Sequence, residues 1–182
     1  MREFFLNTPR LGFSVWSEKD IADALELWGN PEVTKFIAKD GKMSTEQVHQ
    51  RLKSEIETYN NEDIQYWPIY FMETNENVGC CGLRQYDSLN NIFEIGIHLK
   101  KKYWGRGFAQ ESCSAVIEYA FKTLRVNALF AGHNPKNMAS AQLIEKLGFK
   151  YTHDEFYMPT GLYHPSYLMT KQHYRLKQSE QI

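Results

Sequence analysis

The sequence is short of cysteine, of long apolar runs and of net charge, and each shortage excludes a class of protein. It has three cysteines in 182 residues, and Cys80, Cys81 and Cys113 match neither a disulfide framework nor a metal-binding pattern. No run approaches the roughly 18 apolar residues that a membrane span requires. The formal net charge of −1 provides no overall attraction to nucleic acid or to an anionic membrane. We therefore expect no metal site, no membrane and no nucleic-acid partner.

Composition and the start of the chain favour a single cytoplasmic domain. Hydrophobic side chains make up 42% of the sequence, which is enough for one core without disulfides or metals. Residues 1–10 carry charges and a proline and lack the apolar stretch of a signal peptide. The scattered cysteines suit a reducing compartment. We predict that residues 1–182 form one domain that works in the cytoplasm, and the sequence leaves open whether it is a monomer or a homodimer.

Hydrophobic patterning predicts a mixed sheet flanked by helices. Seven segments rich in aromatic and branched residues are expected to be strands: 11–16, 66–74, 78–86, 93–99, 128–133, 149–157 and 166–170. Four segments are expected to be helices: 18–28, 44–59, 107–123 and 137–147. An antiparallel meander comes first and alternating strands and helices follow. This order predicts an α+β fold, with about seven strands in a mostly antiparallel sheet and about four helices around it.

A glycine-rich turn is the first candidate binding site. Residues 99–109 lead from a predicted strand into a predicted helix through Gly105 and Gly107. Unpaired amides and the positive end of the helix dipole can bind a phosphate or pyrophosphate there, and the lysines at 100–102 together with Arg106 would add positive charge. The turn is neither a P-loop nor a dinucleotide fingerprint, because the latter needs a small residue where this chain has Gln110. A basic turn that binds nothing remains the alternative.

Two motifs together resemble a known family. Residues 103–109 (YWGRGFA) followed by residues 137–149 (NMASAQLIEKLGF) closely resemble the GNAT superfamily of acyl-CoA-dependent N-acetyltransferases. They look especially like its Rim-type branch, which acetylates the N-termini of ribosomal proteins. Residues 6–11 (LNTPRL) and 78–83 (VGCCGL) are similar to that branch too, so the resemblance covers nearly the whole chain. It implies the GNAT fold, with a twisted central sheet, and acetyl-CoA as the cosubstrate.

The resemblance also implies how acetyl-CoA is held. The pantetheine arm would pair like an extra strand with the backbone of Ile97, His98 and Leu99. Asn137 would contact the cosubstrate from the following helix. Most of the superfamily has Arg or Gln where this chain has Trp104, a departure that the Rim-type branch shares and that spares the backbone amides. The pyrophosphate would rest on the turn formed by Trp104, Gly105, Arg106, Gly107, Phe108 and Ala109.

Acetyl transfer to an amine needs a group that accepts a proton, because an α-amine titrates near about 8 and a lysine near about 10.4. Glu94 is our candidate general base: on a strand over 93–99 it shares a face with Gly96 and His98, and Gly96 leaves room beside it. Many members of the family carry a glutamate at this point. A β-bulge would change the facing, and a purely structural carboxylate is the alternative. His98 could assist Glu94 or only fill space.

Release of the coenzyme thiolate calls for a proton donor. Many relatives use a tyrosine of the late helix, but the corresponding residue here is Ile144. The Rim-type branch suggests Ser140 as the substitute, acting itself or through water; alternatively, Ser140 only bonds the backbone or the cosubstrate. Backbone amides near Ile97 would stabilise the oxyanion. No acetyl-enzyme is required, since both substrates can react directly in one ternary complex.

The acceptor is the least determined partner. Residues 158–167 look like a loop over the acceptor site, from which Tyr163 and His164 could touch substrate; alternatively, the loop only shapes a turn. We expect a primary amine, either a protein N-terminus, which the Rim-type resemblance favours, or a small molecule such as a polyamine, an aminoglycoside or an amino acid. Two other hypotheses stay open: an acyl-CoA-binding module without turnover, favoured by Ile144, and a structural protein that only keeps the fold.

Overall fold

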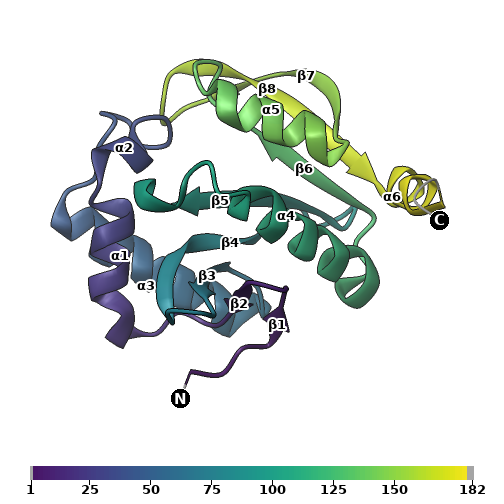
Figure 1. Ribbon diagram of the computed structural model, residues 1–182. Coiled ribbons are helices and arrows are strands. Elements are labelled where there is room, and N and C mark those ends of the chain that lie inside the picture. The colour runs from purple at the N-terminus through teal and green to yellow at the C-terminus, as the bar shows by residue number, and fades with distance from the viewer. Residues whose placement is uncertain (1, 180–182) are drawn as a thin grey trace.

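The structure is a computed structural model that describes residues 2–179. Its strands are β1 (Leu6–Asn7), β2 (Leu11–Phe13), β3 (Tyr66–Phe71), β4 (Glu76–Asp87), β5 (Ile92–Leu99), β6 (Ala128–Gly132), β7 (Lys150–Tyr157) and β8 (Leu162–Thr170). They form an eight-stranded sheet in the order β1-β2-β3-β4-β5-β6-β8-β7. Neighbouring strands are antiparallel except β5 and β6, which are parallel (Figure 1). The predicted mixed, mostly antiparallel sheet is confirmed.

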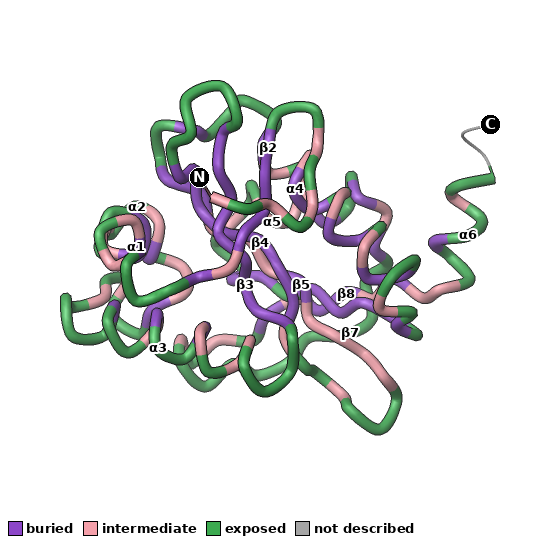
Figure 2. The backbone as a smooth tube through the Cα atoms, turned by 90° about the horizontal axis from the view of Figure 1, so that it is seen from below, coloured by how far each residue is buried: buried purple, intermediate pink, exposed green. Residues whose placement is uncertain are grey.

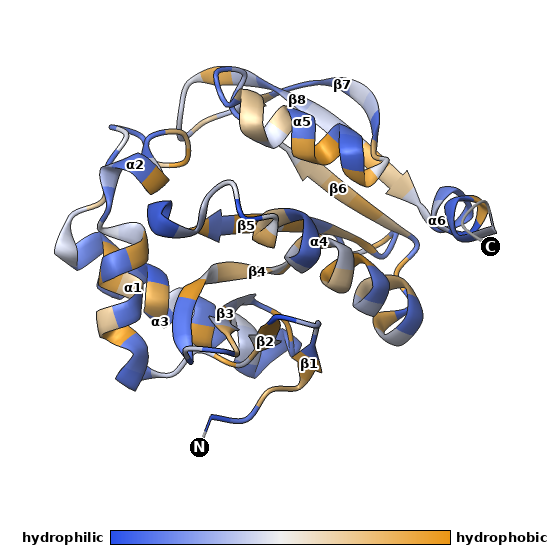
Figure 3. Cartoon of the chain, viewed as in Figure 1, coloured by the Kyte–Doolittle hydropathy of each residue, from blue (hydrophilic) through white to orange (hydrophobic). Residues whose placement is uncertain are grey.

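Helices cover both faces of this sheet. They are α1 (Ile21–Trp28), α2 (Pro31–Thr34), α3 (Thr45–Glu62), α4 (Phe108–Tyr119), α5 (Met138–Leu147) and α6 (Lys171–Ser179). Ser44 caps α3 and Asn137 caps α5, each with a side-chain oxygen that accepts an amide of the first turn. Figure 1 shows α1 and α3 on one side of the central strands and α4 on the other. Figure 3 shows β6 as mostly hydrophobic and α6 as mostly hydrophilic, as their buried and exposed positions require.

The predicted helices and strands are present, although their ends differ. The prediction missed β1, α2 and α6, and it treated residues 158–167 as a loop although β8 begins at Leu162. Pro165 explains that error, because a proline argues against the interior of a strand. In the fold, Pro165 directly precedes Ser166, the first residue of β8 that pairs with β6, and Pro165 itself lies opposite Asp154 of β7. Tyr163 and His164 therefore lie on a strand, and only the turn before Leu162 is a loop.

The sheet separates two hydrophobic clusters. The cluster beneath α4 contains buried residues of β2 to β6, while the other lies between the sheet and the α1 and α3 helices. The second cluster includes Trp16, Leu27, Trp28, Val48, Leu52, Tyr66 and Cys80. Figure 2 shows β3 and most of β4 as buried, whereas β7 is exposed along its length. The three cysteines are buried free thiols, as expected for small hydrophobic residues.

The register of β5 fixes which of its side chains share a face. It pairs with β4 without interruption from Glu94, opposite Arg84, to Leu99, opposite Gly79. The irregularity in this pair lies on β4, between Gln85 and Asp87. Alternation along β5 therefore holds, so Glu94 shares its face with the residues two and four positions later, as the sequence predicted.

The two parallel strands diverge soon after they meet. β5 pairs with β6 over three residues only, from Ile92 opposite Ala128 to Glu94 opposite Phe130. Beyond Glu94, the edge of β5 has no neighbouring strand, and in Figure 1 the β6, β8 and β7 group bends away above it. This divergence positions the site described next.

Candidate active site

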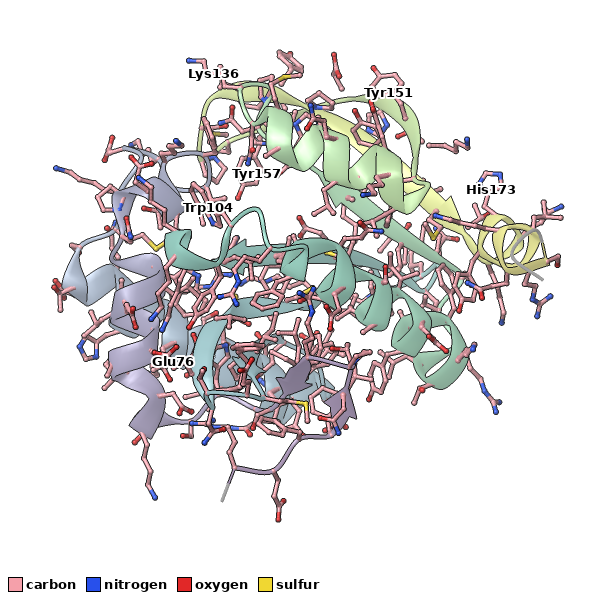
Figure 4. The ribbon with its side chains drawn as sticks, in the orientation of Figure 1. Glu76, Trp104, Lys136, Tyr151, Tyr157 and His173 are labelled. Carbon is pink, nitrogen blue, oxygen red and sulfur yellow. The ribbon has the colours of Figure 1, made fainter. Side chains whose placement is uncertain are left out.

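A cleft of about 760 Å³ occupies the place where β5 and β6 diverge. Its walls come from β5, the start of α4, α5, β6, the β7–β8 hairpin and the segment around α2. Figure 4 shows Trp104 and Tyr157 on facing sides of this space. The cleft thus brings the glycine-rich turn, the candidate base and the hairpin into one site.

The glycine-rich turn presents backbone amides to this cleft. Gly105 and Gly107 have φ values of +72° and +79°, in the region that favours glycine. Gly107 caps α4, and the first helical bond runs from the Glu111 amide to the Gly107 carbonyl at 3.1 Å, so the amides of the first turn lack helical acceptors. A Cβ on Gly105 would meet nothing within 4 Å. This open cradle of amides fits a pyrophosphate.

The charge around the turn differs from the prediction. The three lysines that precede it are engaged by carboxylates: Lys100 with Asp23 and Glu26, Lys101 with Glu32, and Lys102 with Glu26 and Glu76. Lys100 is almost fully buried, so it supports the fold and adds no exposed charge. Arg106 stacks on the Phe108 ring at 5.0 Å, and Arg10 donates to the Arg106 carbonyl at 3.1 Å. Arg10 also pairs with Glu111, so a carboxylate engages it as well. The anion site therefore rests on the backbone amides of the turn.

The open edge of β5 carries two of the three predicted backbone contacts. Lys100 donates its amide to the Val78 carbonyl at 2.9 Å, and bonded pairs alternate along antiparallel strands. The backbone of His98 therefore turns toward β4, while that of Ile97 and Leu99 turns toward the cleft. The Leu99 carbonyl also accepts the Trp104 indole N–H at 2.8 Å. Ile97 is thus the residue of this edge whose polar groups face the cleft most freely.

Glu94 lies half-buried in the same cleft. Burial raises the pKa of Glu94, and the guanidinium of Arg84 opposes that shift. The space that Gly96 leaves is filled: a Cβ on Gly96 would lie 2.2 Å from the hydroxyl oxygen of Tyr66. Sequence patterns do not reveal this role of Tyr66, because its contact with Gly96 depends on the register of β3 against β4 and of β4 against β5.

A buried carboxylate holds the cations nearest Glu94. Glu55 accepts the Arg51 Nε at 2.8 Å, the Tyr66 amide at 2.9 Å and a nitrogen of Arg84. Arg84 also lies over the Tyr66 ring, 4.6 Å from its centroid. Both arginines therefore have a partner other than Glu94, which leaves that carboxylate available to an incoming group.

Comparison with known proteins agrees with this geometry. The acetyltransferase (GNAT) domain model matches residues 10–150, which is more than half of the chain. The chain belongs to this family. As a GNAT acetyltransferase it is an acyltransferase that uses acetyl-CoA as its cosubstrate.

Individual relatives show the range within the family. An uncharacterized N-acetyltransferase p20 of Bacillus licheniformis is 30% identical over 145 residues, which is 80% of this chain and 82% of that protein. Spermidine N-acetyltransferase of Vibrio cholerae, solved with CoA and spermine, has a TM-score of 0.77 at 14% identity and covers 92% of this chain and 99% of its own. An acetyltransferase of Salmonella typhimurium that modifies the N-terminal serine of a 50S ribosomal protein has a TM-score of 0.75 at 14% identity. The match covers 90% of this chain and 96% of that protein. Because both proteins are only 14% identical to this chain, these two structures show that the fold is shared and nothing about the acceptor.

In this GNAT chain, α5 supplies the far wall of the cleft. Asn137 and Ser140 both line it, and the Asn137 side-chain oxygen accepts the Ser140 amide at 3.2 Å. Capping thus occupies the oxygen of Asn137 and leaves its amide nitrogen to contact a ligand. Ile144 is buried at the cleft wall. Since its side chain is a hydrocarbon, this position offers no hydroxyl to the cleft.

His98 is held as a neutral ring. The Trp28 indole N–H donates to His98 Nδ1 at 3.1 Å, so this nitrogen is an acceptor and the proton is on Nε2. Burial lowers the pKa of His98 well below its usual value, and Arg51 and Arg84 add to the shift. His98 therefore packs against the α1 helix and is poorly suited to accept a proton.

The hairpin places its two predicted residues differently. His164 is buried and lines the cleft, and its Nε2 lies 2.9 Å from the Thr160 hydroxyl. Tyr163 is 64% exposed, is not among the residues that line the cleft, and packs on Phe156 with ring centroids 5.4 Å apart. The sequence missed the cleft residues Tyr86, Phe130, Glu155 and Tyr157, which no motif marks.

The described residues include neither a membrane-spanning helix nor a cluster of metal-ligating side chains. Among residues 2–179, no helix is long and apolar enough to cross a membrane. Within the same part of the chain, no group of three or more metal-ligating side chains could hold an ion.

Proposed function

We propose that this protein transfers the acetyl group of acetyl-CoA to a primary amine by direct attack in a ternary complex, with the α-amine of a protein or peptide as the first acceptor class to test. One observation carries the proposal: β5 ends in an amide cradle at one end of the cleft and holds the half-buried Glu94 at the other. We further propose that residues 1–182 act as one domain in the cytoplasm, where the free thiols of Cys80, Cys81 and Cys113 fit a reducing environment.

In this proposal the cleft holds acetyl-CoA along β5. The amides of residues 105–109 would bind its pyrophosphate, and Ile97 and Leu99 would pair with its pantetheine arm. Asn137 would contact it through the side-chain nitrogen. Acetyl-CoA supplies a thioester whose acetyl group an amine can accept.

Glu94 would accept the proton that the amine must lose, directly or through water. Its raised pKa makes the carboxylate a stronger base than an exposed glutamate. The Ile97 amide, which turns toward the cleft, would stabilise negative charge on the reacting carbonyl oxygen. Ser140 would return a proton to the departing thiolate, since its hydroxyl lies on the cleft wall one turn before Ile144.

The proposed class of acceptor, a peptide α-amine, is inferred from the resemblance to the Rim-type branch of the family. Residues of the Rim-type motifs favour a peptide α-amine, and the Salmonella structure with this fold modifies an N-terminal serine. A polyamine is the competing acceptor, because the Vibrio cholerae structure with the same fold acts on spermidine. The absence of a hydroxyl at Ile144 favours a second function, a binding module that holds acyl-CoA without turnover.

Release of free thiol from acetyl-CoA tests these alternatives. The enzyme should release thiol with a peptide that carries a free N-terminal serine, and Glu94→Gln should lower kcat/KM by about 100-fold or more. Thermal stabilisation by acetyl-CoA without thiol release over a panel of amines would establish the binding module instead. Full turnover by the Glu94→Gln variant would remove Glu94 from the mechanism.

A further inference from the structure

The acceptor end of the cleft holds a second carboxylate in a fixed position. The Tyr86 hydroxyl donates to Glu155 Oε2 at 3.1 Å, from β4 to β7. The Tyr86 ring stacks on Phe130 with centroids 4.0 Å apart and planes 6° apart. Phe130 lies opposite Glu94 in the pairing of β5 with β6. The stacked rings of Tyr86 and Phe130 therefore lie between Glu155 and Glu94.

The cations nearest these carboxylates are paired with another acidic group. Arg51 and Arg84, which line the same cleft, bond to the buried Glu55. Among residues 2–179, neither Glu94 nor Glu155 forms an ion pair with a lysine, arginine or histidine side chain. Burial is the main cause of the raised pKa of Glu94, Arg84 and Arg51 oppose the shift, and the negative charge of Glu155 adds a smaller increase. A cationic ligand would relieve this repulsion.

The walls between the carboxylates are aromatic. Tyr86, Phe130 and Tyr157 all line the cleft beside Glu94 and Glu155. Aromatic faces attract organic cations, and the attraction grows when the cation loses its water. Carboxylates set among rings therefore suit an alkylammonium group better than a neutral amine or a hydroxyl.

We propose that Glu155, held by Tyr86, binds the acceptor as its ammonium form and thereby makes the enzyme specific for alkyl primary amines, whether peptide α-amines or polyamines. This inference rests on the proposed function of the cleft. Glu155 is a specificity residue that receives the charged amine. The nitrogen then loses two protons as its bond to the acetyl carbon forms and the C–S bond of the thioester breaks: Glu94 accepts one, and the other ends, through Ser140, on the departing thiolate. Weakly basic aromatic amines, which arrive uncharged, would gain nothing from Glu155.

Kinetics of Glu155→Gln test the proposal, with spermidine and a short peptide with a free N-terminal serine as probes. The variant should raise KM for the amine by about 10-fold or more while kcat changes little, because binding of the charged group is lost before chemistry. Tyr86→Phe, which keeps the ring and removes the bond to Glu155, should raise the same KM by a smaller factor.

Asp154→Asn is the matched control. Asp154 precedes Glu155 on β7, loses the same charge when changed, and accepts the Tyr151 hydroxyl at 3.3 Å away from the cleft lining. This variant should keep the wild-type KM. A Glu155→Asp variant should recover part of the affinity, which a merely structural role would not produce.

Direct binding separates this inference from the proposed function. Titration of spermidine into the CoA-loaded protein should give a dissociation constant about 10-fold higher for Glu155→Gln than for the wild type. Equal constants, or no binding to the wild type, would overturn the role of Glu155. Binding that depends on Glu155 without thiol release from acetyl-CoA would uphold the ammonium site and instead refute the transferase function.

Discussion

At the scale of single residues, Glu94 combines a favourable position for catalysis with a cost in stability. Burial raises its pKa in the folded protein above the value in the unfolded chain. Ionisation therefore opposes folding, and this cost grows as the pH rises from the unfolded pKa through the folded one. Below the unfolded pKa, near about 4.3, both states are protonated and the cost disappears.

Glu94→Gln should therefore unfold at a higher temperature than the wild type at pH 7. A gain of about 1 kcal/mol would raise the midpoint by about 2–4 °C in a chain of this size. Thermal unfolding followed by circular dichroism at pH 7 and at pH 4 measures the effect, which should shrink at the lower pH. A variant that is less stable at pH 7 would show that the carboxylate stabilises the fold.

The sequence predicted some of these residue positions and missed others for a physical reason. Alternation along one strand is local, so the shared face of Glu94 and His98 followed from their spacing. The filling of the gap at Gly96 by Tyr66 depends on two strand pairings, and the tautomer of His98 depends on Trp28 from a distant helix. Contacts of this kind are set by the fold as a whole.

At the scale of elements, Glu55 ties α3 to the sheet. Its carboxylate is 1% exposed and bonds Arg51 of its own helix, Arg84 of β4 and the Tyr66 amide of β3. Removing one partner of a buried ion pair leaves an uncompensated charge and typically costs about 3–5 kcal/mol.

Glu55→Gln should lower the free energy of unfolding by that amount, as measured by urea denaturation. Glu57→Gln, on the same helix, is the control: it removes an exposed pair with Lys53, which is worth about 0–1 kcal/mol. A small effect at Glu55 would mean that Arg84 and Arg51 find water or another acceptor when the carboxylate is lost.

The turn before α4 is the second element whose role can be isolated. Gly105 and Gly161 both have positive φ and open space where a Cβ would stand, but only Gly105 lines the cleft. An alanine at either position should cost about 1–2 kcal/mol of stability through backbone strain.

Gly105→Ala should also weaken acetyl-CoA binding, because its methyl group would project into the cradle, whereas Gly161→Ala should bind normally. Isothermal titration with CoA measures both, and we expect a loss of about 10-fold for Gly105→Ala, equivalent to one lost charge-assisted hydrogen bond. Equal affinities in the two variants would show that the pyrophosphate does not rest on this turn.

At the scale of the whole molecule, the sequence predicted the order and type of most elements but not the pairing of charges between them. The sequence predicted that the lysines before the turn add positive charge for a phosphate, yet Lys100 is buried against Asp23 and Glu26 of α1, more than 70 positions away. Local composition cannot reveal such partners. The same fold that removes these charges from the site fixes the end of β5 to α1, which gives the cradle a rigid base.

Binding of the cosubstrate should therefore couple the two halves of the sheet. Only three residue pairs join β5 to β6, whereas the turn and α5 face each other across the cleft. At a CoA concentration of about 100 times Kd, linkage predicts a stabilisation of about 2.7 kcal/mol, or about 5–11 °C in the thermal midpoint. Hydrogen exchange should slow both at residues 105–109 and at the start of α5, since a ligand that bridges the cleft restrains both walls. Protection of the turn without protection of α5 would show that CoA binds to one half of the sheet and that the cleft does not close around it.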